Sequence, residues 1–163
     1  MRPAREPELS LDLTLSYGCS RRGVPARSSF IRWALAAMRS AGQRGSFELS
    51  LRVVDAAEGL ALNRDFRGKA YPTNVLSFPA DLPPRRGPRL LGDIALCAPV
   101  VAQEALEQGK SVTAHYAHLS IHGVLHLLGY DHDAAARAAT MEAIEVRTLA
   151  TLGHANPYEL SIP

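Results

Sequence analysis

Three histidines in one short run constrain this chain more than any other feature of its sequence. His122, His126 and His132 stand at positions i, i+4 and i+10. On a helix, side chains four residues apart lie on one face, about 40° apart around the axis, so the first two can reach one metal ion. Gly129 can end the helix in the left-handed conformation, which lets the chain turn back and present His132. The pattern predicts a zinc ion held by three neutral nitrogens, with the open position typical of catalytic sites.

The spacing is that of the H-E-x-x-H-x-x-G-x-x-H signature of zinc peptidases, with one difference. In that signature a glutamate follows the first histidine and acts as the general base of peptide hydrolysis. This chain has Gly123 at that position. Loss of a general base lowers a rate by about 10²–10⁴-fold. The sequence therefore favours a different metal-dependent reaction, with a zinc metallopeptidase-like hydrolase as an alternative.

Neighbouring residues have two interpretations each. Asp131 is the nearest carboxylate, and it either orients a ligand imidazole or caps the following helix. Tyr130 either lines the site or packs in the core. We expect His115 and His118, earlier on the same helix, to be polar surface residues or partners of the ligands, because the set of three is already complete.

Composition is that of a soluble globular protein. The chain has 163 residues, of which 47% are hydrophobic and 21% charged, and its net charge is only +2. We expect one domain over residues 9–155, with tails at 1–8 and 156–163. Neither an apolar run long enough to cross a membrane nor a secretory leader is evident. Two cysteines outside any motif fit a reducing compartment, so we expect a cytoplasmic protein.

Hydrophobic periodicity predicts an α+β fold, close to α/β, in which a small mixed four-stranded sheet packs against about five helices. We expect the zinc site on a C-terminal helix, the one that carries the histidines. We expect Asp55 to cap one helix, Ser111 or Thr113 to begin the histidine helix, and Asp133 to cap the last helix. Strands are predicted over 9–15, 47–53, 75–78 and 92–97, and helices over 30–38, 60–67, 100–108, 113–128 and 134–152.

Four motifs, in order, resemble those of the YbeY endoribonucleases, bacterial factors of ribosomal RNA maturation. The run from His122 to His132 is similar to H-G-x-L-H-L-x-G-Y-D-H. Leu62-Asn-Arg-Asp-Phe-Arg67 is similar to L-N-x-x-Y/F-R, Pro72-Thr-Asn-Val-Leu-Ser-Phe-Pro79 to T-D-V-L-S-F-P, and Leu91-Gly-Asp-Ile94 to L-G-D-I. The resemblance covers residues 45–153.

This resemblance implies a zinc-dependent endoribonuclease specific for single-stranded RNA, without a role on DNA. It implies action on the 3′ end of small-subunit ribosomal RNA and in ribosome quality control, with the ribosome or small-subunit proteins as partners. One zinc ion per chain would be held by His122, His126 and His132. Without the resemblance, Arg67 is a helix-end arginine. With it, the planar guanidinium becomes a catalytic and substrate-binding phosphate clamp.

The remaining site candidates follow from the same motifs. Asn74 stands where the family often has aspartate, and it keeps the size of that side chain but not its charge. We therefore expect Asn74 and Tyr130 to bind substrate, and Asp131 to be the second catalytic candidate. A non-catalytic ribosome assembly factor with structural zinc is a further alternative. It would need a fourth protein ligand, for which only the remote His154 is available.

Overall fold

The computed structural model describes residues 7–83 and 86–159 of the chain. The predicted order of helices and strands is confirmed over these residues. The elements are β1 (Ser10–Gly18), α1 (Arg27–Ser40), β2 (Ser46–Val54), α2 (Ala56–Arg67), β3 (Val75–Pro79), β4 (Arg89–Cys97), α3 (Ala98–Glu107), α4 (Val112–Leu127) and α5 (Ala135–Thr151).

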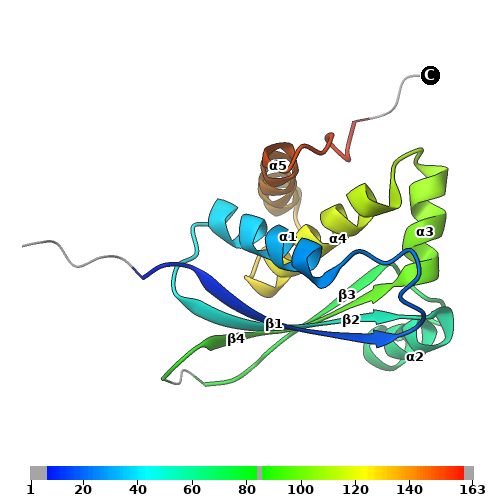
Figure 1. Ribbon diagram of the computed structural model, residues 1–163, viewed down its shortest axis with the longest axis horizontal. Helices are drawn as coiled ribbons and strands as arrows, with labels where there is room; N and C mark the ends of the chain where they lie inside the picture. Colours follow the sequence, from blue (N-terminus) through cyan, green and yellow to red (C-terminus); the bar gives the residue numbers. More distant parts are fainter. Residues whose placement is uncertain (1–6, 84–85, 160–163) are drawn as a thin grey trace, which may run out of the picture.

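The four strands form one mixed sheet in the order β1-β2-β4-β3 (Figure 1). β1, β2 and β4 are parallel, and β3 runs antiparallel to β4 at the edge. Parallel neighbours need a crossover, which α1 supplies between β1 and β2. Alternating residues of β2, namely Leu49, Leu51 and Val53, are buried under the helices. Among the described strands β3 pairs with β4 alone, so β3 forms one edge of the sheet.

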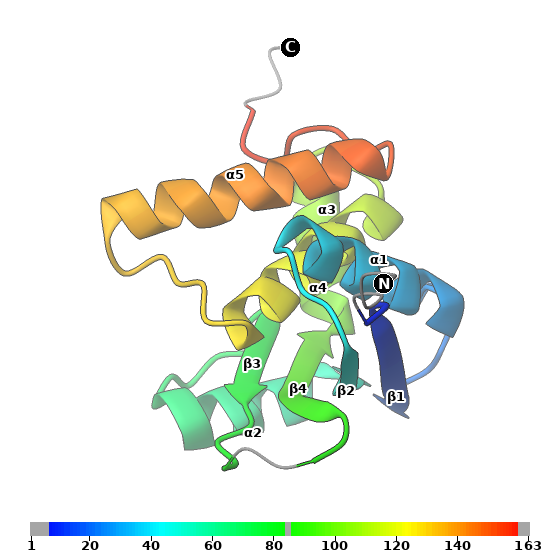
Figure 2. The same cartoon turned by 90° about the vertical axis from the view of Figure 1, so that its left-hand side faces the viewer.

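Helices α1, α4 and α5 form two layers on one face of the sheet. α1 and α4 pack on the strands, and α5 lies across their outer side (Figure 2). α2 packs on the opposite face of the sheet (Figure 1). α4 is buried on most sides because the sheet lies below it and α5 above it, which explains its apolar sequence. The predicted α+β fold with a small mixed sheet and five helices is confirmed.

Helix beginnings agree with the sequence at two positions and differ at a third. The Asp55 carboxylate accepts a hydrogen bond of 2.8 Å from the backbone N–H three residues on. Ser111, rather than Thr113, caps α4 in the same way at 3.1 Å. The prediction that Asp133 caps α5 is wrong. The cap position falls one residue later, at Ala134, which has no side-chain oxygen to accept from the first turn.

Of the two expected tails, residues 1–6 and 160–163 lie outside the described residues. Residues 156–159 follow α5 in a turn, where Tyr158 contacts Glu145. Cys19 and Cys97 are free thiols. No helix within the described ranges is long and apolar enough to cross a membrane.

Candidate active site

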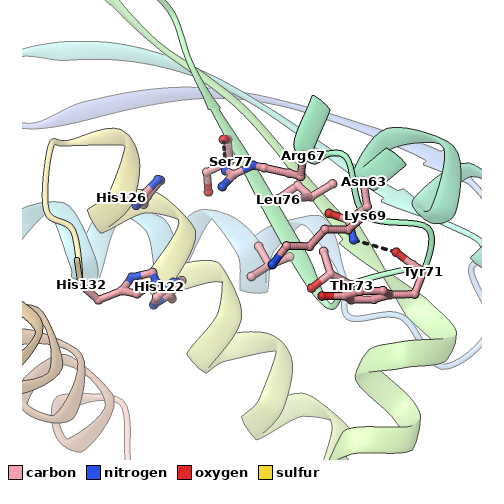
Figure 3. A pocket seen from close by; sticks show the side chains of 11 residues that line it. Asn63, Arg67, Lys69, Tyr71, Thr73, Leu76, Ser77, His122, His126 and His132 are labelled. Carbon is pink, nitrogen blue, oxygen red and sulfur yellow. Dashed lines mark hydrogen bonds between the residues drawn. The ribbon is translucent and has the colours of Figure 1, made fainter. Parts of the chain in front are cut away.

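A cleft of about 250 Å³ lies between the second half of α4 and the edge strand β3 (Figure 3). α4 and the loop after it contribute imidazoles on one side. α2 and the segment leading into β3 contribute cations, hydroxyls and an amide on the other side. The lining residues are Asn63, Arg67, Lys69, Tyr71, Thr73, Val75, Leu76, Ser77, His122, His126 and His132. The three predicted zinc ligands and Arg67 therefore share one cleft.

The end of α4 explains how His132 reaches this cleft. Gly129 adopts a positive φ of 102°. Its N–H bonds to the carbonyl of His126, and the next N–H, of Tyr130, bonds to the carbonyl of Leu125. This pair of bonds ends the helix and reverses the chain, as the sequence predicted for a glycine at this position. His132 then lies beside the two helical imidazoles.

The imidazole of His132 lies close to both helical imidazoles. The ring centroid of His132 lies 5.7 Å from that of His122 and 6.3 Å from that of His126. Rings that bind one tetrahedral zinc ion through nitrogens at about 2.0–2.1 Å have centroids roughly 5 Å apart. In the described part of the chain, no three His, Cys, Asp or Glu side chains are gathered tightly enough to hold a metal ion already. The chemistry of the three donors fits zinc, but the two ring separations from His132 are wider than a bound ion requires.

The electrostatics of His126 suit a metal ligand. Burial lowers the pKa of this imidazole, and the neighbouring His122, Arg67 and His132 lower it further. The ring is therefore neutral near pH 7, and only a neutral imidazole has a lone pair to donate.

Arg67 and Lys69 supply positive charge to the cleft (Figure 3). Arg67 ends α2, and one of its terminal nitrogens donates to the carbonyl of Ser77 on β3 over 3.5 Å. That long contact leaves most of the guanidinium donors available to a ligand. Asp and Glu are absent from the described lining, so the cleft is suited to an anion.

Three predicted site residues lie outside the cleft lining. Asn74 donates from Nδ2 to Glu104 over 2.9 Å and faces α3. Asp131 accepts from the N–H of Asp133 in the turn before α5 and from the side chain of Arg137 on α5. Tyr130 packs against the hydrophobic core. The contacts of Tyr130 agree with its structural alternative, packing in the core. The alternative that Asp131 caps the following helix is wrong, because the cap position of α5 is Ala134 and no side chain bonds there.

The sequence missed one carboxylate close to the site. Glu145 of α5 is fully buried, and its Oε1 lies 2.6 Å from Nδ1 of His122. Burial raises the pKa of this carboxyl, but its contacts with His118, His122 and Tyr158 outweigh burial and lower the pKa to about 2. A signal was available, because Glu145 falls on the buried stripe of α5 between Met141 and Leu149.

The other histidines have defined places. His115 is buried rather than on the surface, and its Nε2 lies 2.8 Å from Glu104. His118 contacts Tyr158, whose hydroxyl is 3.2 Å from Nε2 of the imidazole. His154 lines a different cavity, together with Lys110 and Tyr158. None of the three lines the cleft.

Known proteins resemble this chain in sequence and in fold. The family model described as Endoribonuclease YbeY matches residues 23–153. The chain belongs to the YbeY endoribonuclease family. Endoribonuclease YbeY from Alkalilimnicola ehrlichii is 54% identical over 154 residues, which cover 93% of each chain. The protein of that name from Stenotrophomonas maltophilia strain R551-3 is 55% identical over 152 residues, which cover 91% of this chain and 93% of the relative.

A solved structure supports the fold of this YbeY family member. The solution structure of a Thermotoga maritima protein superposes with a TM-score of 0.54 over 87% of this chain and 92% of its own. The two sequences are only 21% identical, so the likeness concerns the fold alone.

Proposed function

We propose that this YbeY family member is a zinc-dependent endoribonuclease that cuts single-stranded RNA. We propose further that it acts in the cytoplasm on the 3′ end of small-subunit ribosomal RNA, in contact with the ribosome or small-subunit proteins. One observation carries the proposal: the imidazoles of His122, His126 and His132 line one cleft and face Arg67 across it. The names of the relatives support RNA as the substrate.

His122, His126 and His132 would hold the zinc ion. A zinc ion bound there would supply Lewis-acid chemistry at the phosphoryl group and would activate water near neutral pH. The chain itself supplies the phosphate contacts. Arg67 binds two phosphoryl oxygens through its planar fork, and Lys69 adds a second positive charge. Both cations stabilise the negative charge that grows on the phosphoryl group during cleavage.

The test compares cleavage of a labelled single-stranded RNA by the wild-type protein and by Arg67→Ala and Arg67→Lys. We expect Arg67→Ala to lose most of its cleavage while zinc content and melting temperature stay nearly unchanged. Arg67→Lys should recover only part of the activity, because an ammonium cannot reproduce the fork.

Arg64→Ala is the matched control, since Arg64 lies on the same helix, is exposed, lies outside the cleft lining and pairs with the neighbouring Asp65. It should cleave like the wild type. Full activity of a stable, zinc-loaded Arg67→Ala protein would rule out the phosphate clamp. Equal cleavage of a duplex of the same sequence would rule out the preference for single strands.

A further inference from the structure

The segment after α5 contacts Glu145, which in turn contacts the proposed zinc ligand His122. α5 lies on the outer side of α4, away from the sheet (Figure 2). Glu145 extends from α5 toward α4, and Tyr158, which follows α5 in the chain, reaches back to the same carboxylate. The match to the family model ends at residue 153, before Tyr158. The contact therefore joins the matched domain to a residue beyond it.

Each oxygen of the Glu145 carboxylate has its own partner. Oε1 accepts from Nδ1 of His122 over 2.6 Å. Oε2 accepts from the hydroxyl of Tyr158, and Nε2 of His118 lies 3.7 Å from the same oxygen. The residue is 0% exposed. A charged group without water is stable only when such partners are present, so the carboxylate depends on both residues.

The first contact fixes the state of His122. A carboxylate cannot donate, so Nδ1 of His122 must carry the hydrogen of this bond. Nε2 is then the nitrogen with a free lone pair. A carboxylate behind a ligand imidazole fixes the tautomer and the ring orientation, and it makes the ring a stronger donor.

The second contact fixes Glu145. The Tyr158 hydroxyl has one hydrogen, which it donates to Glu145, so it can accept from Nε2 of His118 at 3.2 Å. The rings of Tyr158 and His118 also meet edge to face, with centroids 5.4 Å apart. Asn156 holds the turn, because its Oδ1 accepts from the N–H of Tyr158 over 2.8 Å. The contact with His118 and the bond to Asn156 thus hold Tyr158 in position.

We propose that Glu145 is a positioning residue for His122, and that Tyr158 makes the segment after α5 part of the metal site by holding Glu145. This inference rests on the proposed function, since it assumes that His122 binds zinc. Loss of the Tyr158 hydroxyl leaves one oxygen of a buried carboxylate without its donor. Glu145 can then shift from His122, and the imidazole loses its fixed tautomer.

The experiment measures the zinc dissociation constant by competition with a chromophoric chelator at constant pH. Glu145→Gln should weaken zinc binding by about 10–100-fold, the usual effect of losing such a partner. Tyr158→Phe keeps the ring and removes only the hydroxyl, so it should weaken binding by about fivefold. Glu142→Gln removes a charge from an exposed position of the same helix and should leave binding unchanged.

A second readout uses the metal-free protein. Nitrogen chemical shifts of His122 should show the Nδ1–H tautomer in the wild type and a mixture of tautomers in both variants. Tyr158 is partly exposed, so Tyr158→Phe should fold even where Glu145→Gln does not.

Three possible results test the inference and separate its failure from that of the proposed function. Weaker zinc binding and a tautomer mixture in the variants support the inference. Wild-type zinc affinity and an unchanged tautomer in folded Tyr158→Phe overturn it and leave the proposed function intact. A wild-type protein that binds no zinc overturns the metal part of the proposed function and the inference together, even where the tautomer measurement shows that Glu145 orients His122.

Discussion

Replacement of Gly123 by glutamate would restore the residue that zinc peptidases have after the first histidine, and we predict that it destabilises this fold instead. Gly123 is buried where α4 crosses the sheet. A Cβ atom there would lie 3.0 Å from Cδ1 of Ile94 on β4 and 3.3 Å from Oγ of Ser77 on β3. The backbone carbonyl of Gly123 also accepts from the Ser77 hydroxyl over 3.4 Å. The position faces the sheet, and a longer side chain has no room.

The expected change in the free energy of unfolding is the balance of helix propensity and crowding, and for glutamate also of charge burial. Gly123→Ala gains about 1 kcal/mol of helix propensity. Crowding of Ile94 costs about 1–3 kcal/mol, although the contact is with the flexible end of that side chain. The alanine variant should therefore lose about 0–2 kcal/mol. Gly123→Glu adds an unpaired buried carboxylate, which costs about 3 kcal/mol more. This loss is large beside the total stability of about 5–15 kcal/mol for a typical domain.

Urea unfolding of the metal-free proteins measures these differences. The fluorescence of the one tryptophan, Trp33, reports the transition because its side chain is fully buried. Thr113→Glu is the control, since this residue is exposed in the first turn of the same helix, where a negative charge is tolerated. A Gly123→Glu protein within about 1 kcal/mol of the wild type would refute the reasoning. It would show that the position can open toward the cleft, and it would reopen the peptidase alternative.

Three further predictions follow from the described contacts. Asn74→Asp introduces the aspartate of the T-D-V-L-S-F-P motif and should lower stability by about 1–3 kcal/mol in urea unfolding, because a carboxylate replaces the amide that donates to Glu104. Equal or greater stability of the variant would contradict this. Gly129→Ala should lower the melting temperature and weaken zinc binding. The φ of 102° at Gly129 strains any residue with a side chain, and this turn sets the position of His132. Unchanged zinc affinity of the variant would contradict this prediction. Burial lowers the pKa of His115, so the unfolded chain takes up a proton first and stability falls as the pH drops below about 6.5. His115→Asn should then cost less stability at about pH 5.5 than at about pH 8, and an equal cost at both would argue against it.

Local patterns in the sequence predicted the helices, the strands and the grouping of the three histidines. The spacing of His122, His126 and His132 combines helix geometry with a glycine end, and both depend on residues close in the chain. The strands and helices follow from hydrophobic periods of two and 3.6 residues in the same way. Strand order depends on contacts between distant segments, and the position of β3 at the edge of the sheet was not predicted.

The orientation of single side chains was harder to predict. Asn74 lies in a motif whose neighbours, Thr73 and Val75, line the cleft. Asn74 itself stands in a bend just before β3, and its side chain faces Glu104 instead. Glu145 was missed because it contacts His122 across two helices, at a separation of 23 residues. Only its place on an apolar stripe indicated burial.

The most direct test of the account is metal analysis combined with cleavage of labelled single-stranded RNA, on one preparation of the wild type and of His126→Ala. We predict about one zinc ion per wild-type chain. A chelator should abolish cleavage, and added zinc should restore it. His126→Ala should lose both the metal and the activity. Cleavage that survives removal of the metal, or full zinc occupancy in His126→Ala, would contradict the account, and zinc binding without any cleavage would favour a non-catalytic assembly factor.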